Sequence, residues 1–212
     1  ENTQPLRTAV VAIIGRPSAG KSTFLNTACQ EPVSIVSPIP QTTRNAIKGI
    51  VNTSFGQLIF IDTPGYHDSE KKLNLRLRNV TETQLDDIDC VLYVIDSTRP
   101  TGEEESAASN LLKNLQSKTV VAINKTDLAS SQPLPVKQFI HENLPEIPDE
   151  RILEMSAEKD IGINEVLKAL YGISPEGQPM YDEELYTDQD LTFRISEVIR
   201  GEAIQRLQDE IP

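Results

Sequence analysis

The sequence predicts an α/β fold in which a mostly parallel six-stranded sheet, with one antiparallel hairpin, carries helices on both faces. Continuous apolar runs alternate with segments of helical spacing along the chain. These runs lack the alternation of half-exposed strands, so they indicate strands buried on both faces, as in parallel sheets. One pair of strands is separated only by Phe55-Gly56, a link short enough for an antiparallel hairpin.

The expected elements follow in chain order. Strands are predicted at Thr8–Ile14, Ala46–Ser54, Gln57–Asp62, Cys90–Asp96, Lys118–Asn124 and Arg151–Met155. Helices are predicted at Ser22–Cys29, Leu73–Leu85, Glu103–Leu115, Val136–Asn143 and Ile163–Tyr171. Glu31–Asn45 contains three prolines and several hydroxyl side chains, so we expect a loop there.

The character of the chain changes after Gly172, which predicts one domain over residues 1–172. Residues 173–190 are rich in acidic side chains and contain proline and glycine, so they read as an exposed acidic linker. Between Leu191 and Ile211, apolar residues recur at steps of three and four, which predicts an amphipathic helix over residues 191–212. This helical extension is expected to pack on the domain or to lead into a further one.

Composition excludes several classes of protein. Apolar residues make up 38% and charged residues 25% of the chain, as in globular domains rather than disordered ones. The net charge of −12 repels nucleic acids and anionic membranes. Two cysteines and two histidines make neither a disulfide framework nor a zinc site, which favours the reducing cytoplasm. No apolar run is long enough to span a membrane.

Residues 15–22 read GRPSAGKS and match the phosphate-loop pattern G-x-x-x-x-G-K-[ST]. The glycines let successive N–H groups converge on phosphate oxygens, and the helix that follows favours anions at its N-terminus. Lys21 is expected to reach the β and γ phosphates, and the Ser22 hydroxyl is expected to ligate Mg²⁺. The predicted phosphate-binding residues are Gly15, Ser18, Ala19, Gly20, Lys21, Ser22 and Thr23.

Two further segments supply candidate metal and switch residues. Asp62, at the tip of a predicted strand beside the phosphate loop, is placed to hold Mg²⁺, and Gly65 could sense the γ phosphate through its N–H. Thr43, preferred over Thr42, could complete the Mg²⁺ shell when the γ phosphate is present. Lys21, Thr43 and Gly65 are therefore the candidate catalytic residues.

The motif Asn124-Lys125-Thr126-Asp127 ends a predicted strand and predicts recognition of guanine. The Asp127 carboxylate can accept hydrogen bonds from N1–H and the 2-amino group, which adenine cannot supply. Asn124 would tie loops together, and the Lys125 stem would cover the base plane. Ser156 and Ala157 follow the last strand, where the Ala157 N–H would meet guanine O6.

The motifs GRPSAGKST, QTTRN, DTPG, NKTD and SA, in this order, resemble the Ras-like P-loop GTPases of the TrmE–Era–EngA class and, within it, the Era family. The segment LYTDQDLTFRISEVIRGEAIQRLQDEIP is similar to the part of Era proteins that leads into their KH domain. The resemblance implies a Mg²⁺-dependent GTP-hydrolysing switch in small ribosomal subunit assembly, which contacts 16S rRNA through a KH domain not included in these residues. It also implies peripheral contact with the inner face of the cell membrane, and we expect a monomer.

Two positions depart from common patterns. Ser18 stands where many potassium-stimulated relatives carry Asn, and a serine offers no amide oxygen to K⁺, so the sequence leaves K⁺ activation open. Tyr66 stands where Ras-type enzymes carry the glutamine that orients water, which predicts slow intrinsic hydrolysis. The alternatives are another GTPase of the same class and a nucleotide-dependent docking module with negligible hydrolysis.

Overall fold

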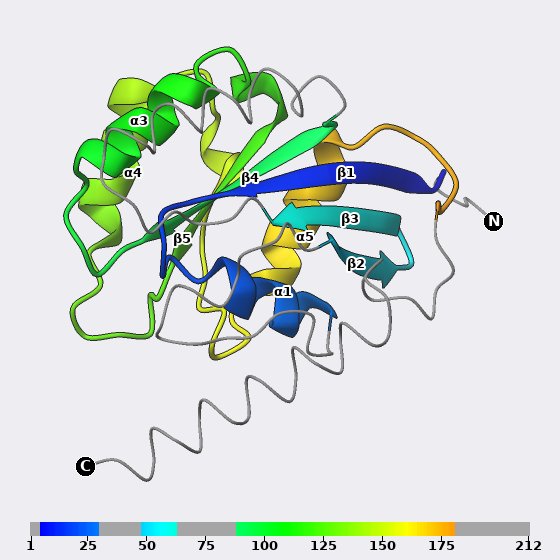
Figure 1. The fold of residues 1–212 in the computed structure, drawn as a ribbon, viewed down its shortest axis with the longest axis horizontal. Helices are drawn as coiled ribbons and strands as arrows, with labels where there is room; N and C mark the ends of the chain where they lie inside the picture. The colour runs from blue at the N-terminus through cyan, green and yellow to red at the C-terminus, as the bar shows by residue number, and fades with distance from the viewer. Residues whose placement is uncertain (1–4, 30–47, 63–87, 181–212) are drawn as a thin grey trace, which may run out of the picture.

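The computed structural model describes residues 5–29, 48–62 and 88–180, and these fold around one six-stranded sheet (Figure 1). The strands are β1 (Arg7–Ile14), β2 (Lys48–Thr53), β3 (Gly56–Asp62), β4 (Cys90–Asp96), β5 (Thr119–Asn124) and β6 (Ile152–Glu154). Their order is β2-β3-β1-β4-β5-β6, and only the β2–β3 pair is antiparallel. The predicted fold class is confirmed, including its hairpin.

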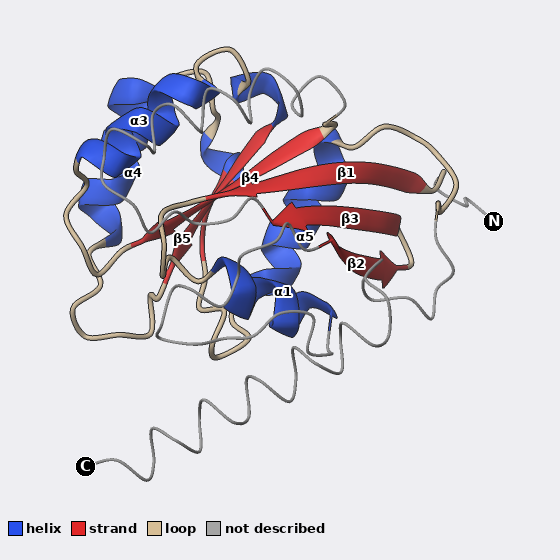
Figure 2. Ribbon diagram, in the orientation of Figure 1, coloured by secondary structure: helices blue, strands red, loops and turns tan. Residues whose placement is uncertain are grey.

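Helices cover both faces of the sheet (Figure 2). They are α1 (Lys21–Cys29), α3 (Glu103–Leu112), α4 (Pro133–Asn143) and α5 (Ile163–Ile173). The alternation of side chains along each strand divides the core into two layers. In β1, Ala9, Val11 and Ile13 pack with α1 and α5, whereas Ala12 and Ile14 pack with α3 and α4. This double burial is why the strand sequences are apolar without interruption.

The structure shifts several predicted boundaries by a few residues. Helix α3 ends at Leu112, three residues before the predicted end, and α4 begins at Pro133, three residues before the predicted start. Proline is favoured in a first helical turn because the N–H it lacks would have no partner there. The predicted loop 31–45, the helix 73–85 and the extension 191–212 lie outside the described residues.

The carboxyl ends of the five parallel strands meet at one edge of the sheet, and the predicted motifs lie there. The phosphate loop follows β1, and Asp62 is the last residue of β3. The NKTD motif begins at the end of β5, and Ser156 follows β6. Ligands of open α/β sheets bind at this edge, so the topology alone brings the motifs together.

The chain beyond α5 runs back along the opposite edge of the sheet, where β1 and β3 begin. The Thr8 N–H donates to the Pro175 carbonyl at 3.2 Å, and the Gly177 N–H donates to the Leu6 carbonyl at 2.9 Å. The Met180 N–H reaches Gln57 Oε1 at 2.9 Å. The first part of the predicted linker is therefore held against the sheet. None of the helices in the described ranges is long and apolar enough to cross a membrane.

Candidate guanine-nucleotide site

The phosphate loop joins β1 to α1 through a turn that uses left-handed backbone angles. Ser18 has a φ of 63° and Gly20 a φ of 105°. A Cβ atom at Gly20 would lie 2.1 Å from Asn124 Nδ2, so both the backbone angle and the available space require glycine. Ser18 holds a conformation that L-residues rarely adopt, and such conformations concentrate at functional sites.

Lys21 is the first residue of α1, and its side chain folds back over the loop. The ammonium Nζ donates to the carbonyl oxygens of Gly15 at 2.8 Å and Arg16 at 3.0 Å, and the side chain is buried. A positive charge is thereby held beside the N-terminus of a helix, where the free N–H groups favour anions. This arrangement suits the phosphates of a nucleotide, and Ser22 and Thr23 follow in the same helical turn.

Asn124 connects the phosphate loop to the loop after β6, as the sequence predicts. Its Nδ2 donates to the Ala19 carbonyl at 2.9 Å, and its Oδ1 accepts from the Ala157 N–H at 3.0 Å. The Thr27 hydroxyl in α1 adds a bond of 2.8 Å to the Ala157 carbonyl. All three bonds join segments far apart in sequence, so the two halves of the site form one unit.

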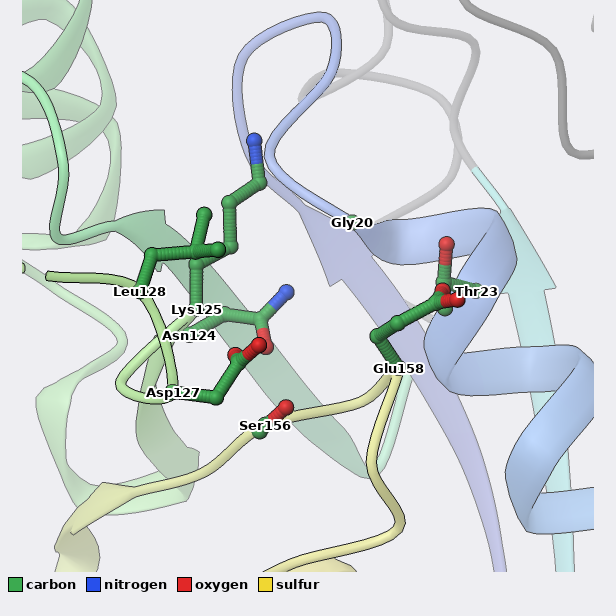
Figure 3. A pocket seen from close by; sticks show the side chains of 8 residues that line it. All are labelled: Gly20, Thr23, Asn124, Lys125, Asp127, Leu128, Ser156 and Glu158. Atoms are coloured by element: carbon green, nitrogen blue, oxygen red, sulfur yellow. The ribbon is translucent and has the colours of Figure 1, made fainter.

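A pocket of about 240 Å³ opens between α1 and the loops that follow β5 and β6 (Figure 3). The Asp127 carboxylate points into it (Figure 3). Thr126 ties the NKTD loop to the end of β6, because its N–H and its hydroxyl both donate to the Met155 carbonyl, at 3.3 and 2.9 Å. The pocket is lined by Gly20, Thr23, Asn124, Lys125, Asp127, Leu128, Ser156 and Glu158.

Lys125 also lines the pocket, and its charge is neutralised by Asp96 on the neighbouring strand. Its Nζ lies 2.7 Å from Asp96 Oδ2, at the end of β4. Burial of Asp96 opposes ionisation, but hydrogen bonds from Lys125 and Thr98 outweigh it and lower the pKa of the Asp96 carboxyl. The Lys125 ammonium group is thus held by Asp96, while the side chain lines the pocket. This position is compatible with the prediction that the aliphatic part of Lys125 covers the base plane.

The Ala157 N–H, which the sequence assigns to guanine O6, already donates to Asn124 in this structure. Its role toward O6 therefore stays a prediction, and it requires this N–H to be shared between two acceptors. Ser156 serves the loop itself, because its Oγ accepts from the Lys159 N–H at 3.2 Å. Ser156 and Ile161 also pair through two backbone hydrogen bonds, of 2.9 and 3.0 Å.

The predicted Mg²⁺ ligands are only partly within the described residues. The register of β1 and β3 pairs Ile13 with Asp62, so Asp62 ends its strand next to the one that enters the phosphate loop. A hydroxyl from Ser22 and a carboxylate from Asp62 are hard oxygen donors that suit Mg²⁺. Thr43 and Gly65 lie outside the described residues. Within the described ranges, no three His, Cys, Asp or Glu side chains gather into a metal cluster.

Comparisons with known proteins agree with this geometry. The family model for the 50S ribosome-binding GTPase matches residues 10–125. GTPase Era of Treponema denticola is 59% identical over 98% of this chain and 70% of its own length. GTPase Era of Treponema pallidum is 43% identical over 97% of this chain and 70% of its own length.

The chain belongs to the Era family of GTPases. Its enzymatic activity is therefore the hydrolysis of GTP. A crystal structure of Era in complex with MgGDPNP and nucleotides 1506–1542 of 16S ribosomal RNA superimposes with a TM-score of 0.79 at 33% identity. The match covers 93% of this chain and 67% of that Era chain.

Several residues of this Era-family site escape prediction from the sequence. Asp96 neutralises Lys125, Thr126 anchors the NKTD loop, and Glu158 lines the pocket. Asp96 could have been found, because it ends a buried strand at the same sheet edge as Asp62. Thr126 and Glu158 are polar residues in polar loops, so only the folded geometry reveals what they contact.

We predict that Glu158→Gln tightens the binding of both GDP and GTP about two- to fivefold at low salt. Lys125 is paired with Asp96, so Asp127 and Glu158 leave the pocket with an excess of negative charge toward a polyanionic ligand. Titration with fluorescent GDP at two salt concentrations measures the effect. Glu150→Gln, an exposed residue outside the pocket lining, is the matched control. An unchanged or weakened affinity for GDP at low salt would contradict the electrostatic argument.

Proposed function

We propose that this chain is the nucleotide switch of an assembly factor for the small ribosomal subunit, with 16S rRNA as its partner. The observation that carries the nucleotide-switch part of the proposal is the amide of Asn124, which joins the phosphate loop to the loop after β6, where we place guanine recognition, as one site. The solved Era complex with 16S ribosomal RNA supports the choice of partner. The matching family model is described by the 50S subunit, so the large subunit is the second candidate.

The residues of the site suggest how they act on GTP. Lys21 neutralises charge on the β and γ phosphates, and the N–H groups of the phosphate loop bind the phosphate oxygens. Asp127 selects guanine, while Asn124 holds the base loop and the phosphate loop at a fixed separation. The reaction in this proposal is in-line attack of water on the γ phosphate. Thr43 and Gly65 are proposed to sense that phosphate.

Ser22, Asp62 and Thr43 are the proposed Mg²⁺ ligands. When bound, the ion neutralises charge that develops on the phosphates during transfer. The hydroxyl of Ser22 and the carboxylate of Asp62 are hard oxygen donors, which suit Mg²⁺ better than they suit a transition metal. Asp62 ends the strand next to the one that enters the phosphate loop. K⁺ activation is not part of the proposal, because Ser18 provides a hydroxyl and no amide oxygen.

The negative charge of the chain bears on how RNA is bound. At −12, the chain as a whole repels a polyanion. We therefore assign the RNA contact to a KH domain beyond these residues and expect this chain alone to bind 16S rRNA weakly. We also propose that the protein is a cytoplasmic monomer with peripheral contact at the inner face of the cell membrane. Light scattering tests the monomeric state, and vesicle flotation tests the membrane contact.

Single-turnover hydrolysis of GTP tests the proposed function. The rate is measured with the chain alone, with small ribosomal subunits and with large ribosomal subunits. We expect slow hydrolysis by the chain alone, and subunit-dependent acceleration only when the RNA-binding domain is also present. Acceleration by large subunits alone would favour the second candidate, and no hydrolysis under any condition would favour a docking module.

A further inference from the structure

Arg16, the second residue of the phosphate loop, pairs its side chain with acidic residues of helix α3. Its Nε lies 3.3 Å from Glu105 Oε1, and its Nη1 lies 3.7 Å from Glu104 Oε2. The Glu105 side chain is 4% exposed, the Arg16 side chain 10% and the Glu104 side chain 41%. The close and buried partner of Arg16 is therefore Glu105.

The guanidinium is held mainly by this charge pairing. Within the described part of the chain, Arg16 Nε and Nη2 are buried without a hydrogen-bond partner, and so is the Tyr93 hydroxyl. Tyr93 lies in β4, opposite Ile14; burial raises the pKa of its hydroxyl, the Glu105 charge raises this pKa further and the Arg16 charge lowers it. A buried charge with so few hydrogen bonds depends on its ion-pair partner to stay in place.

Glu105 is itself fixed by the start of α3. Its Oε2 accepts from the Gly102 N–H at 3.1 Å, which caps the first turn of the helix. The Ser106 N–H donates to the Gly102 carbonyl at 3.0 Å, so the helix begins at a defined point. The carboxylate that faces Arg16 therefore cannot move without uncapping the helix.

The backbone carbonyl of Arg16 contacts the Lys21 side chain. Its carbonyl oxygen accepts from the Lys21 Nζ at 3.0 Å and from the Ala19 N–H at 3.2 Å. The side chain and the carbonyl of one residue thus join α3 to Lys21 through four groups in series: the Gly102 N–H, the Glu105 carboxylate, Arg16 and the Lys21 ammonium.

We infer that Arg16, locked by Glu105, is a positioning residue for GTP hydrolysis that holds the phosphate loop and Lys21 against helix α3. The inference rests on the proposed role of Lys21 toward the β and γ phosphates. A loosened Arg16 lets its carbonyl shift, so the lysine that the carbonyl holds shifts with it. Small misplacements of a positioned group lower rates strongly. The loss should fall on GTP more than on GDP, because only GTP presents a γ phosphate to Lys21.

The test compares Glu105→Gln with Glu104→Gln in the full chain. Both replace one carboxylate in the first turn of α3, but only Glu105 is buried against Arg16. The GTP and GDP dissociation constants and the single-turnover rate are measured at a temperature where urea titration shows both variants folded. We expect Glu105→Gln to lower the rate about tenfold and the ratio of GTP to GDP affinity about threefold or more, roughly 1.4 and 0.7 kcal/mol. Glu104→Gln should stay within twofold.

The double variant Arg16→Gln/Glu105→Gln removes both charges of the pair, which keeps the test usable if the single neutral variants do not fold. Arg16→Lys keeps the charge without the planar guanidinium, so we expect it to lose less of the hydrolysis rate than the double variant does. A Glu105→Gln protein that unfolds more easily but keeps the wild-type rate and affinity ratio would overturn the inference. Equal weakening of GDP and GTP would overturn it as well. If Lys21→Ala binds GTP normally, the proposed function fails instead, so the two failures are distinguishable.

Discussion

Asp127→Asn is expected to move nucleotide preference from GTP to XTP. The carboxylate accepts from N1–H and the 2-amino group of guanine, whereas an asparagine side chain presents one acceptor and one donor. Xanthine keeps N1–H and replaces the amino group with an oxygen acceptor, so it matches the asparagine. Hydrogen bonds to charged groups contribute about 1.5–3 kcal/mol each, so we expect GTP affinity to fall about 100-fold or more.

Calorimetric titration of the variant with GTP and XTP in Mg²⁺ measures this exchange. Asp149→Asn provides the control, because that carboxylate is 86% exposed, pairs only with His141 among the described residues and does not line the pocket. The control should bind GTP as the unmodified chain does. Unchanged GTP affinity in Asp127→Asn would contradict the assignment of guanine recognition to Asp127.

Lys21→Ala should abolish tight binding of GTP and lower GDP affinity by a smaller factor. The Lys21 side chain is buried at the start of α1, and its ammonium group is bonded to two loop carbonyls, so its positive charge is held at a fixed place in the phosphate loop. Loss of a charge-assisted contact to both the β and the γ phosphates corresponds to about 100-fold or more in GTP affinity. Hydrolysis should fall further, because charge on the phosphates grows in the transition state.

The matched control is Lys137→Ala, which removes a half-buried lysine charge of α4 that pairs with Glu154 of β6. Urea unfolding of Lys21→Ala is needed beside the titration, since the two carbonyls of Gly15 and Arg16 lose a donor. A folded Lys21→Ala protein that binds GTP at full strength would remove the phosphate-loop assignment.

The buried strands were predictable because burial on both faces leaves an unbroken apolar run. Cys90–Asp96 is observed with the predicted bounds, and every one of its residues is buried. The ends of helices were less predictable, since exposed terminal turns lack an apolar pattern. At the site, the residues of GRPSAGKS and NKTD are recognisable because phosphate and guanine chemistry prescribes their types and spacing.

The contacts that hold the site together could not be predicted in the same way. Arg16 with Glu105, and Lys125 with Asp96, join residues that only the crossovers between strands bring close. A charged residue in a loop looks the same in sequence whether it is solvated or buried against a distant helix. Asn124 is the intermediate case, because its type suggested a link between loops and the structure supplied the two partners.

The return of the chain along the beginning of β1 bears on how small a stable fragment can be. A fragment cut at residue 172 would remove the partners of the Thr8 N–H and the Leu6 carbonyl, and Gln57 would keep its bond to Asn52 but lose the one from the Met180 N–H. It would also free the Arg7 guanidinium, which donates to the Ser174 carbonyl at 2.5 Å. Backbone N–H and C=O groups without hydrogen-bond partners destabilise the edge of a sheet and can pair with other protein molecules. We therefore expect the shortest stable fragment to extend through Met180.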